Sequence, residues 1–181
     1  MKIILIRHGM TEGNLKRRYI GTTDEDLINT DCLKGDYPKC ERVVASPLKR
    51  CIQTAEYIYP NVDIEICDKL KECDFGDFEN KSYEDLKNNS DYQKWLDSNG
   101  ELPLPNGETH EDFKNRCKDG FFESLTERDT AFVIHGGSIM AIMQKLFGGN
   151  FYDYQVKNGC GYEFEMRNGE IVDDYSPIGC G

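Results

Sequence analysis

The chain has 181 residues, with 33 acidic and 22 basic side chains and a formal net charge of −11. This length suits one domain with its own hydrophobic core, residues 1–181. The acidic balance, without a Lys/Arg-rich block, argues against nucleic acid or an anionic membrane as a partner. No apolar stretch approaches the roughly 20 residues that span a bilayer, and the chain opens without a leader-like segment. We therefore expect a cytoplasmic protein.

The eight cysteines are spread along the chain and form no CxxC pair. In a chain of this length without an export signal, most of them are expected to be reduced packing residues. None is followed six positions later by Arg, so the Cys-x5-Arg loop of cysteine-dependent phosphatases is excluded.

The first element is a run of four apolar residues, 3–6, which predicts a strand buried on both faces of a parallel sheet. It ends at Arg7, His8 and Gly9, and Asn14 follows shortly afterwards. Open α/β sheets place their ligand sites at the carboxyl ends of strands. A cation and an imidazole at this position therefore form the first candidate site.

A polar segment follows, with Arg17, Arg18 and a turn over residues 21–24 that carries two threonines. The arginines are interpreted either as a solvated charge run or as the rim of an anion site, and we slightly favour the rim. The turn offers hydroxyl groups that are free to meet a ligand.

Residues 42–45 predict a second strand, and the next two residues predict a helix start with Ser46 as N-cap and Pro47 at the first helical position. Arg50 lies near this helix N-terminus, where both the guanidinium group and the helix dipole favour an anion. One face of the helix is expected to pack on the core through Leu48, Ile52, Ala55 and Ile58.

Candidate proton donors follow an edge strand that is predicted over residues 62–66 by alternating apolar and acidic residues. Glu72 and Asp74 compete for this role, with Asp77 and Glu79 nearby. A general acid here needs a pKa raised by burial or by a neighbouring negative charge. A solvated acidic loop is the alternative interpretation.

A polar insertion at about 76–107 is expected to form short helices above the sheet and to act as a lid that sets substrate selectivity. Its aromatic residues either stack on a substrate or, more commonly, pack the lid itself: Tyr83, Tyr92 and Trp95. His110 follows on a polar helix start, so we expect it on the surface, outside the catalytic set.

A second strand-end histidine lies near the end of the chain. Residues 108–125 predict a helix with a core-facing stripe of Phe113, Cys117, Phe121 and Phe122. The buried strand predicted over residues 130–134 then leads to His135 and Gly136, before an apolar helix over 139–147. Glycines at such a turn let backbone N–H groups approach an anion closely.

Four motifs together resemble the histidine phosphatase superfamily, whose fold is that of the phosphoglycerate mutases. They are Arg7-His8-Gly9 with Asn14, Ser46 to Arg50, Leu70 to Gly76 with Glu72, and His135-Gly136-Gly137. The resemblance covers nearly the whole chain. It implies an α/β three-layer sandwich with a mainly parallel central sheet flanked by helices, and a metal-independent phosphomonoesterase that forms a phosphohistidine.

The resemblance also implies a role for each matching residue. His8 is the expected nucleophile and Glu72 the proton donor, while the phosphoryl oxygens are held by Arg7, Arg50 and His135. The substrate-binding positions that it implies are Asn14, Gly21, Thr22, Thr23 and Gly136. Arg and His⁺ would supply the positive charge, so neither a metal nor another cofactor is expected, and the partner is a small phosphorylated metabolite.

The chain departs from the family pattern at two places. Met10 follows Arg-His-Gly where the family often has Glu or Gln, and segment 29–42 carries Gly35 and Pro38 where the family usually has a long helix. We expect that helix to be shortened or broken. Cys51 and Cys73 each adjoin a candidate catalytic residue, but adjacent residues usually point elsewhere, so sensitivity to oxidation is not expected.

Within the family, the short length and the motif from Pro105 to Thr109 are most similar to alpha-ribazole phosphatases and their general phosphatase relatives. Alpha-ribazole 5′-phosphate is therefore one candidate substrate, and phosphoglycerate mutase activity is the alternative in the same class. A non-catalytic binding module on this fold is another alternative. Residues 24–26, Asp-Glu-Asp, superficially resemble the Asp-x-Asp motif of metal-dependent phosphotransferases, although the preceding apolar strand and the following Thr are missing.

Overall fold

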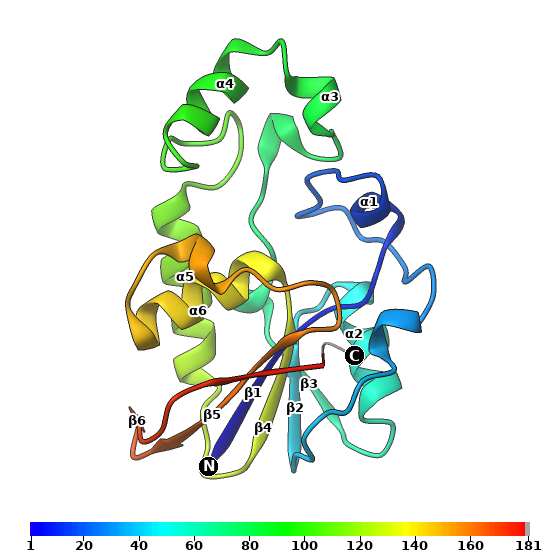
Figure 1. Ribbon diagram of the computed structural model, residues 1–181, viewed down its shortest axis with the longest axis vertical. Coiled ribbons are helices and arrows are strands. Elements are labelled where there is room, and N and C mark those ends of the chain that lie inside the picture. The colour runs from blue at the N-terminus through cyan, green and yellow to red at the C-terminus, as the bar shows by residue number, and fades with distance from the viewer. Residues whose placement is uncertain (180–181) are drawn as a thin grey trace.

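The computed structural model describes residues 1–179 and contains a mixed sheet between two layers of helices (Figure 1). The sheet has seven strands, in the order β3-β2-β4-β1-β5-β6, with β7 paired to β5. The strands are β1 (Lys2–Arg7), β2 (Arg42–Ala45), β3 (Ile64–Ile66), β4 (Thr130–Ile134), β5 (Gly161–Arg167), β6 (Glu170–Ile171) and β7 (Ser176–Ile178). This architecture confirms the α/β three-layer fold.

The helices cover both faces of the sheet and extend beyond its upper end. The α-helices are α1 (Glu12–Leu15), α2 (Lys49–Ile58), α3 (Tyr83–Leu86), α4 (Ser90–Asp97), α5 (His110–Glu123) and α6 (Gly136–Phe147). Single 3₁₀ turns are η1 (Asp31–Leu33), η2 (Asp68–Leu70), η3 (Gly76–Phe78) and η4 (Phe151–Tyr154). In Figure 1, α5 and α6 lie on one side of the sheet and α2 on the other.

Four neighbouring strands, β3, β2, β4 and β1, run parallel, and β5 returns antiparallel beside β1. Parallel strands end at the same edge of a sheet, so their carboxyl ends deliver side chains to one place. The register pairs Arg7 at the end of β1 with Ile134 at the end of β4. The residues that follow these two, His8 and His135, therefore lie beside each other. Sheet pairing therefore brings together two histidines that are far apart in the sequence.

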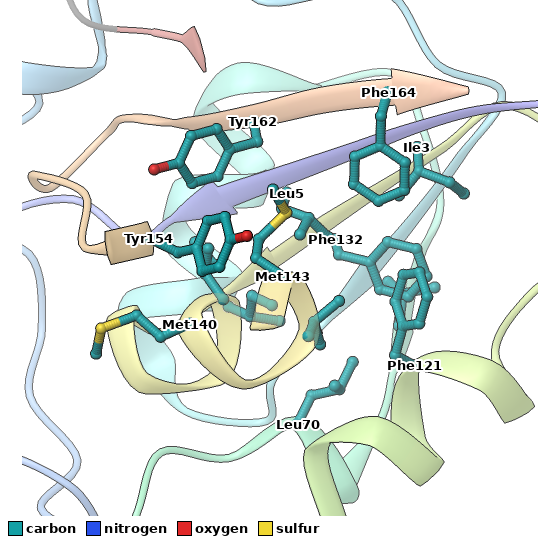
Figure 2. Packing of buried hydrophobic residues seen from close by; sticks show 14 of the residues in the cluster. Ile3, Leu5, Leu70, Phe121, Phe132, Met140, Met143, Tyr154, Tyr162 and Phe164 are labelled. Carbon is teal, nitrogen blue, oxygen red and sulfur yellow. The ribbon is translucent and has the colours of Figure 1, made fainter. Parts of the chain in front are cut away.

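The central strand β1 is buried on both faces, as its apolar run predicts. Ile3 and Leu5 belong to the cluster that packs against α5 and α6, which Figure 2 shows from close by. Ile4 and Ile6 belong to the opposite cluster, which includes side chains of α2. Each face of the strand thus contributes to a separate core, and together they hold the strand end that carries His8.

Two details of helix packing differ from the expectations. Ser46 is not an N-cap: α2 begins at Lys49, its N-cap is Leu48, and no side chain caps it. The inward face of helix α2 includes Cys51 and Ala55, whereas Ile52 is only half-buried. Phe122 in α5 is 37% exposed, so the core-facing stripe of that helix lacks it.

The segment 29–42 holds the single turn η1 and the first residue of β2, so the expected loss of a long helix is confirmed. The insertion at 76–107 forms the short helices α3 and α4 beyond the carboxyl edge of the sheet (Figure 1). It has its own small core with α5, built from Phe78, Leu86, Tyr92, Leu104 and Phe113. Its movement as a lid remains a prediction.

Across residues 1–179, no helix has both the length and the apolar character needed to cross a membrane. Six cysteines have free thiols, namely Cys32, Cys40, Cys51, Cys67, Cys73 and Cys117, whereas Cys160 is disulfide-bonded. Burial raises the pKa of Cys51, to about 12, and raises that of Cys73 still further. Both thiols are therefore protonated at neutral pH, and the resistance of the site to oxidation remains a prediction.

Candidate active site

A cavity of about 450 Å³ opens at the carboxyl edge of the sheet. Five of the sequence-predicted site residues line it: Arg7, His8, Asn14, Glu72 and Gly136. Parallel strands β1 and β4 deliver the polar residues to one end of this space, as the topology requires. The volume falls within the range of about 300–1,000 Å³ that is typical of small-molecule sites.

The His8 side chain is only 4% exposed and has a defined tautomer. Its Nδ1 lies 2.7 Å from the carbonyl oxygen of Gly9. A carbonyl only accepts hydrogen bonds, so Nδ1 carries the proton and donates it, and Nε2 of the neutral ring is unprotonated. Burial, followed by the charges of Arg50 and Arg7, lowers the pKa of His8 well below 6.5. His8 is therefore neutral at pH 7, with a lone pair on Nε2.

The backbone on either side of the His8 ring is held by two side chains. Asn158 donates from Nδ2 to the carbonyl oxygens of His8 and Gly9, at 3.1 and 3.2 Å, and to Oδ1 of Asn14 at 3.0 Å. Thr54 accepts a 2.8 Å hydrogen bond from the Gly9 amide. These contacts fix the carbonyl that sets the His8 tautomer.

Arg7 lies at the end of β1 and is partly committed to the protein. One terminal nitrogen donates to the carbonyl oxygen of Val156 at 2.7 Å. Its Nε is buried and has no hydrogen-bond acceptor within residues 1–179. A buried, unpaired donor on a permanent cation is suited to an anionic ligand, because leaving it unpaired is otherwise unfavourable.

His135 and Arg50 are fully buried and do not belong to the described cavity lining. Nε of Arg50 donates to Nδ1 of His135 at 3.3 Å, so that nitrogen is the acceptor and Nε2 bears the proton. Nε2 then donates to Oγ of Ser46 at 2.7 Å. Burial and the Arg50 charge lower the pKa of His135 well below 6.5. The structure thus brings these two predicted residues together, with His135 neutral.

The loop at residues 20–23 contacts Arg50. The terminal guanidinium nitrogens of Arg50 donate to the carbonyl oxygens of Thr23 at 2.7 Å, Gly21 at 2.9 Å and Ile20 at 3.4 Å. The Gly21 and Thr23 amides donate to Glu79. Ile20 lines the cavity. The predicted substrate-binding positions Gly21, Thr22 and Thr23 are not among the described residues that line it.

Glu72 lies where the chain passes the start of α6. Its two carboxylate oxygens accept hydrogen bonds from the amides of Cys73, at 2.9 Å, and Gly137, at 3.0 Å. Burial raises the pKa of Glu72 above 4.5, although these hydrogen bonds and the charges of Arg50 and Arg7 oppose the shift. A Cβ at position 137 would lie 2.3 Å from Oε1 of Glu72, so only glycine allows this approach. Asp74, the competing acid, instead accepts from the Gly76 amide.

The walls of the cavity are largely apolar and aromatic. They include Tyr19, Phe75, Trp95, Leu102, Leu104, Phe113, Met140, Phe151 and Tyr152. Met10, Arg17 and Arg18 also line it, in agreement with the rim interpretation of the arginines. Tyr92 is buried in the insertion core and Tyr83 is 54% exposed, so of the three aromatic residues singled out from the insertion, Trp95 reaches the cavity.

The expectation that His110 lies on the surface is wrong. Its side chain is 11% exposed and lines the cavity, because α5 begins against η4 and the ring packs edge-on to Phe151 at 4.8 Å. Its Nδ1 lies 3.2 Å from Oε1 of Glu101. Burial and Lys114 lower the pKa of His110, despite the raising effect of Glu101, so this ring is neutral at pH 7.

Within residues 1–179, no group of three or more His, Cys, Asp or Glu side chains is arranged to hold a metal ion. The Asp-Glu-Asp segment has local partners: Asp24 accepts from the Lys49 amide at 2.8 Å, and Asp26 accepts from Gln53 at 2.7 Å. These contacts link the loop to α2.

Sequence reasoning missed three residues that hold the site: Ser46 as a partner of His135, Thr54 and Asn158. Ser46 follows a strand end, which is a signal for a site residue, but the Ser-Pro pattern predicts an N-cap instead. Asn158 lies in a polar turn that shows no pattern of its own. Its partners are about 150 residues away in the sequence, and only the sheet pairing brings them close.

Comparison with known proteins identifies the family. The model of the histidine phosphatase superfamily, branch 1, matches residues 3–173. This chain belongs to that superfamily. Among curated relatives, the uncharacterized phosphatase PhoE of Bacillus subtilis is 31% identical over 187 residues, covering 94% of this chain and 92% of the relative. This histidine phosphatase is accordingly an enzyme that hydrolyses phosphate esters.

Solved structures agree with the fold of this histidine phosphatase. The alpha-ribazole phosphatase from Shigella flexneri superposes with a TM-score of 0.80 at 25% identity, covering 94% of this chain and 93% of that one. A phosphoserine phosphatase from Entamoeba histolytica, in complex with 3-phosphoglyceric acid, gives 0.79 at 24% identity, with 98% and 95% covered. The second likeness concerns the fold alone.

Proposed function

We propose that this histidine phosphatase is a metal-independent phosphomonoesterase that transfers the phosphoryl group of its substrate to Nε2 of His8. The observation that carries the proposal is the hydrogen bond from Nδ1 of His8 to the Gly9 carbonyl. It leaves Nε2 unprotonated on a side chain that lines the cavity. A neutral imidazole in this tautomer is ready to act as a nucleophile.

In the first step, the Nε2 lone pair forms a bond to phosphorus while the bond from phosphorus to the ester oxygen breaks. Protonated Glu72 gives its proton to the departing oxygen, for which its raised pKa is suited. In the second step, Glu72 takes a proton from water as the water oxygen attacks phosphorus and the phosphorus–nitrogen bond breaks. Inorganic phosphate and the starting enzyme result.

Positive charge around the phosphoryl oxygens supports both steps. The buried Nε–H of Arg7 is the donor proposed to meet a phosphoryl oxygen first. Four of the five donors of Arg50 are used by His135 and the loop carbonyls, so its proposed contribution is its fixed charge and the remaining N–H. Asn14 and Gly136, which line the cavity, complete the proposed phosphate environment. Both ring nitrogens of His135 are engaged by Arg50 and Ser46, so its proposed contribution is to hold Arg50 in place.

The aromatic and apolar walls suit a phosphate ester whose alcohol carries a ring system. Among candidates of this kind we place alpha-ribazole 5′-phosphate first, since the Shigella flexneri relative is an alpha-ribazole phosphatase. The ring would lie against Trp95 and Tyr152, with the phosphate at Arg7 and His8.

The test is phosphate release in EDTA from p-nitrophenyl phosphate, 3-phosphoglycerate and alpha-ribazole 5′-phosphate, with His8→Ala as the control. The proposal predicts EDTA-resistant hydrolysis that disappears in the variant, with the ring-bearing esters preferred. Activity that requires a divalent cation, or that survives His8→Ala, would contradict the mechanism. Conversion of 3-phosphoglycerate to its isomer would favour the mutase alternative, and binding without turnover would favour a non-catalytic module.

A further inference from the structure

The start of the insertion forms backbone hydrogen bonds with a loop that lies about 60 residues earlier in the sequence. The Asn80 amide donates to the Tyr19 carbonyl at 2.7 Å, and the Tyr19 amide donates to the Lys81 carbonyl at 2.9 Å. Between these backbone contacts and Arg50 lies the loop of residues 20–23. Glu79 is the charged side chain that reaches this loop from the insertion.

The Glu79 carboxylate makes a set of hydrogen bonds to the loop. The Gly21 amide donates to Oε1 and Oε2 at 2.9 and 3.1 Å, and the Thr23 amide donates to Oε1 at 2.9 Å. The Thr23 hydroxyl adds a fourth contact at 2.8 Å. Hydrogen bonds to an ionised acceptor are about twice as strong as neutral ones.

The same two residues present their carbonyl groups to Arg50. Gly21 and Thr23 each donate an N–H to Glu79 and accept from the Arg50 guanidinium through the carbonyl oxygen. The loop therefore lies between an anion and a fully buried cation. Hydrogen bonds linked in this way polarise one another, so the contact at one end strengthens the contact at the other.

The loop has little freedom to move without losing this arrangement. A Cβ on Gly21 would lie 1.8 Å from the carbonyl oxygen of Cys73, so the backbone is packed directly against the residue that follows Glu72. Arg50 in turn donates to His135. A shift of the loop carbonyls would thus be transmitted to a guanidinium group that sits among the site residues.

We propose that Glu79 is a positioning residue for catalysis, which holds the loop carbonyls on Arg50 and so fixes the guanidinium beside His135. The inference rests on the proposed function, in which the Arg50 charge stabilises the phosphoryl group during transfer. Glu79 does not line the cavity in the described part of the chain and acts through Arg50. Pre-set charges stabilise the transition state more than the ground state, so the effect belongs to kcat.

The first test compares Glu79→Gln with the wild-type enzyme on p-nitrophenyl phosphate. We expect kcat to fall about tenfold, the scale of one charge-assisted hydrogen bond, with KM changed by less than about twofold. Glu84→Gln is the matched control, because Glu84 is exposed on α3 and forms an ion pair with the exposed Lys87. It should leave both constants unchanged.

A double-mutant cycle separates positioning from general damage to the fold. In an Arg50→Lys background, the Glu79→Gln change should lower kcat by less than about twofold, because the planar fork that the loop holds is gone. Equal losses of kcat in both backgrounds would overturn the proposal. An unchanged kcat for Glu79→Gln in the otherwise wild-type enzyme would also overturn it. A change of KM alone would do the same.

Thr23→Val gives a milder variant if Glu79→Gln does not fold, since it removes only the hydroxyl contact to Glu79. Its kcat should fall about two- to threefold with an unchanged KM, and an unchanged kcat would overturn the proposal. An inactive wild-type enzyme would instead overturn the proposed function. The two failures are therefore distinguishable.

Discussion

The imidazole rings of His8 and His135 lie edge to face, with their centroids 5.2 Å apart and an angle of 65° between their planes. One comes from the end of β1 and the other from the end of β4, and sheet register places them side by side. Each ring has its proton fixed by a neighbour: Gly9 for His8 and Ser46 for His135. The site therefore holds two neutral histidines close to two arginines.

This arrangement predicts a bell-shaped pH dependence, in which the acid limb reports His8 and the alkaline limb reports Glu72. His8 must be neutral, so activity is lost as pH falls through its pKa, which burial and Arg50 place well below 6.5. Glu72 must be protonated, so activity is lost as pH rises through its pKa, which burial places above 4.5. The measurement is kcat/KM for phenyl phosphate, whose leaving oxygen needs a proton, from about pH 4 to about pH 9.

A substitution identifies the alkaline limb of that profile. Glu72→Gln should lower the rate with phenyl phosphate and remove the alkaline limb, because the titrating acid is gone. An alkaline limb that persists unchanged in Glu72→Gln would contradict this assignment of acid and nucleophile.

Asn158→Ala should reduce kcat by about tenfold, because Asn158 holds the carbonyl groups of His8 and Gly9 and the side chain of Asn14. Steady-state kinetics with p-nitrophenyl phosphate checks this, with exposed Asn61→Ala as the matched control. Equal kcat values for the two variants would show that the His8 backbone is held without Asn158.

Trp95→Ala should raise KM for a ring-bearing ester by about tenfold and leave KM for 3-phosphoglycerate nearly unchanged, because Trp95 lines the apolar part of the cavity. Tyr83→Ala removes an exposed aromatic ring from the same insertion and should change neither value. Parallel changes for both esters in Trp95→Ala would show that the residue only packs the insertion.

Gly137→Ala should displace the Glu72 carboxylate, because the added methyl would lie 2.3 Å from Oε1. We expect kcat/KM, which reports the first step, to fall at least tenfold with phenyl phosphate and much less with p-nitrophenyl phosphate, whose leaving group does not need the acid. The second step lacks its base with either ester, so kcat should fall with both. Circular dichroism would verify that the variant is folded. Equal losses of kcat/KM with the two esters would place the effect outside proton transfer.

The sequence predicts the central strands β1, β2 and β4 well, because a buried strand requires a continuous apolar run and ends at a recognisable polar residue. Arg7, His8 and His135 are found in this way, and their proximity follows from parallel pairing. Glu72 needed the family resemblance, since its local pattern does not separate it from Asp74. Burial then distinguishes the two acids, and burial depends on tertiary structure.

The errors have physical causes. Ser46 followed by Pro47 satisfies the rules for a helix start, but the imidazole of His135 competes for the hydroxyl group and the helix begins later. His110 is polar and lies at a helix start, yet the packing of α5 on η4 buries it. Asn158 and Glu79 act through contacts across the chain that no local pattern reveals.

In the proposed mechanism, His8 carries the phosphoryl group between the two steps. Glu72→Gln should accumulate this species with p-nitrophenyl phosphate, because the first step does not need the acid and the second lacks its base. After an alkaline quench, which preserves phosphohistidine, mass spectrometry should find one phosphoryl group on the peptide that contains His8. Full turnover without a phosphorylated His8 peptide, or a phosphoryl group on another residue, would contradict the proposed mechanism.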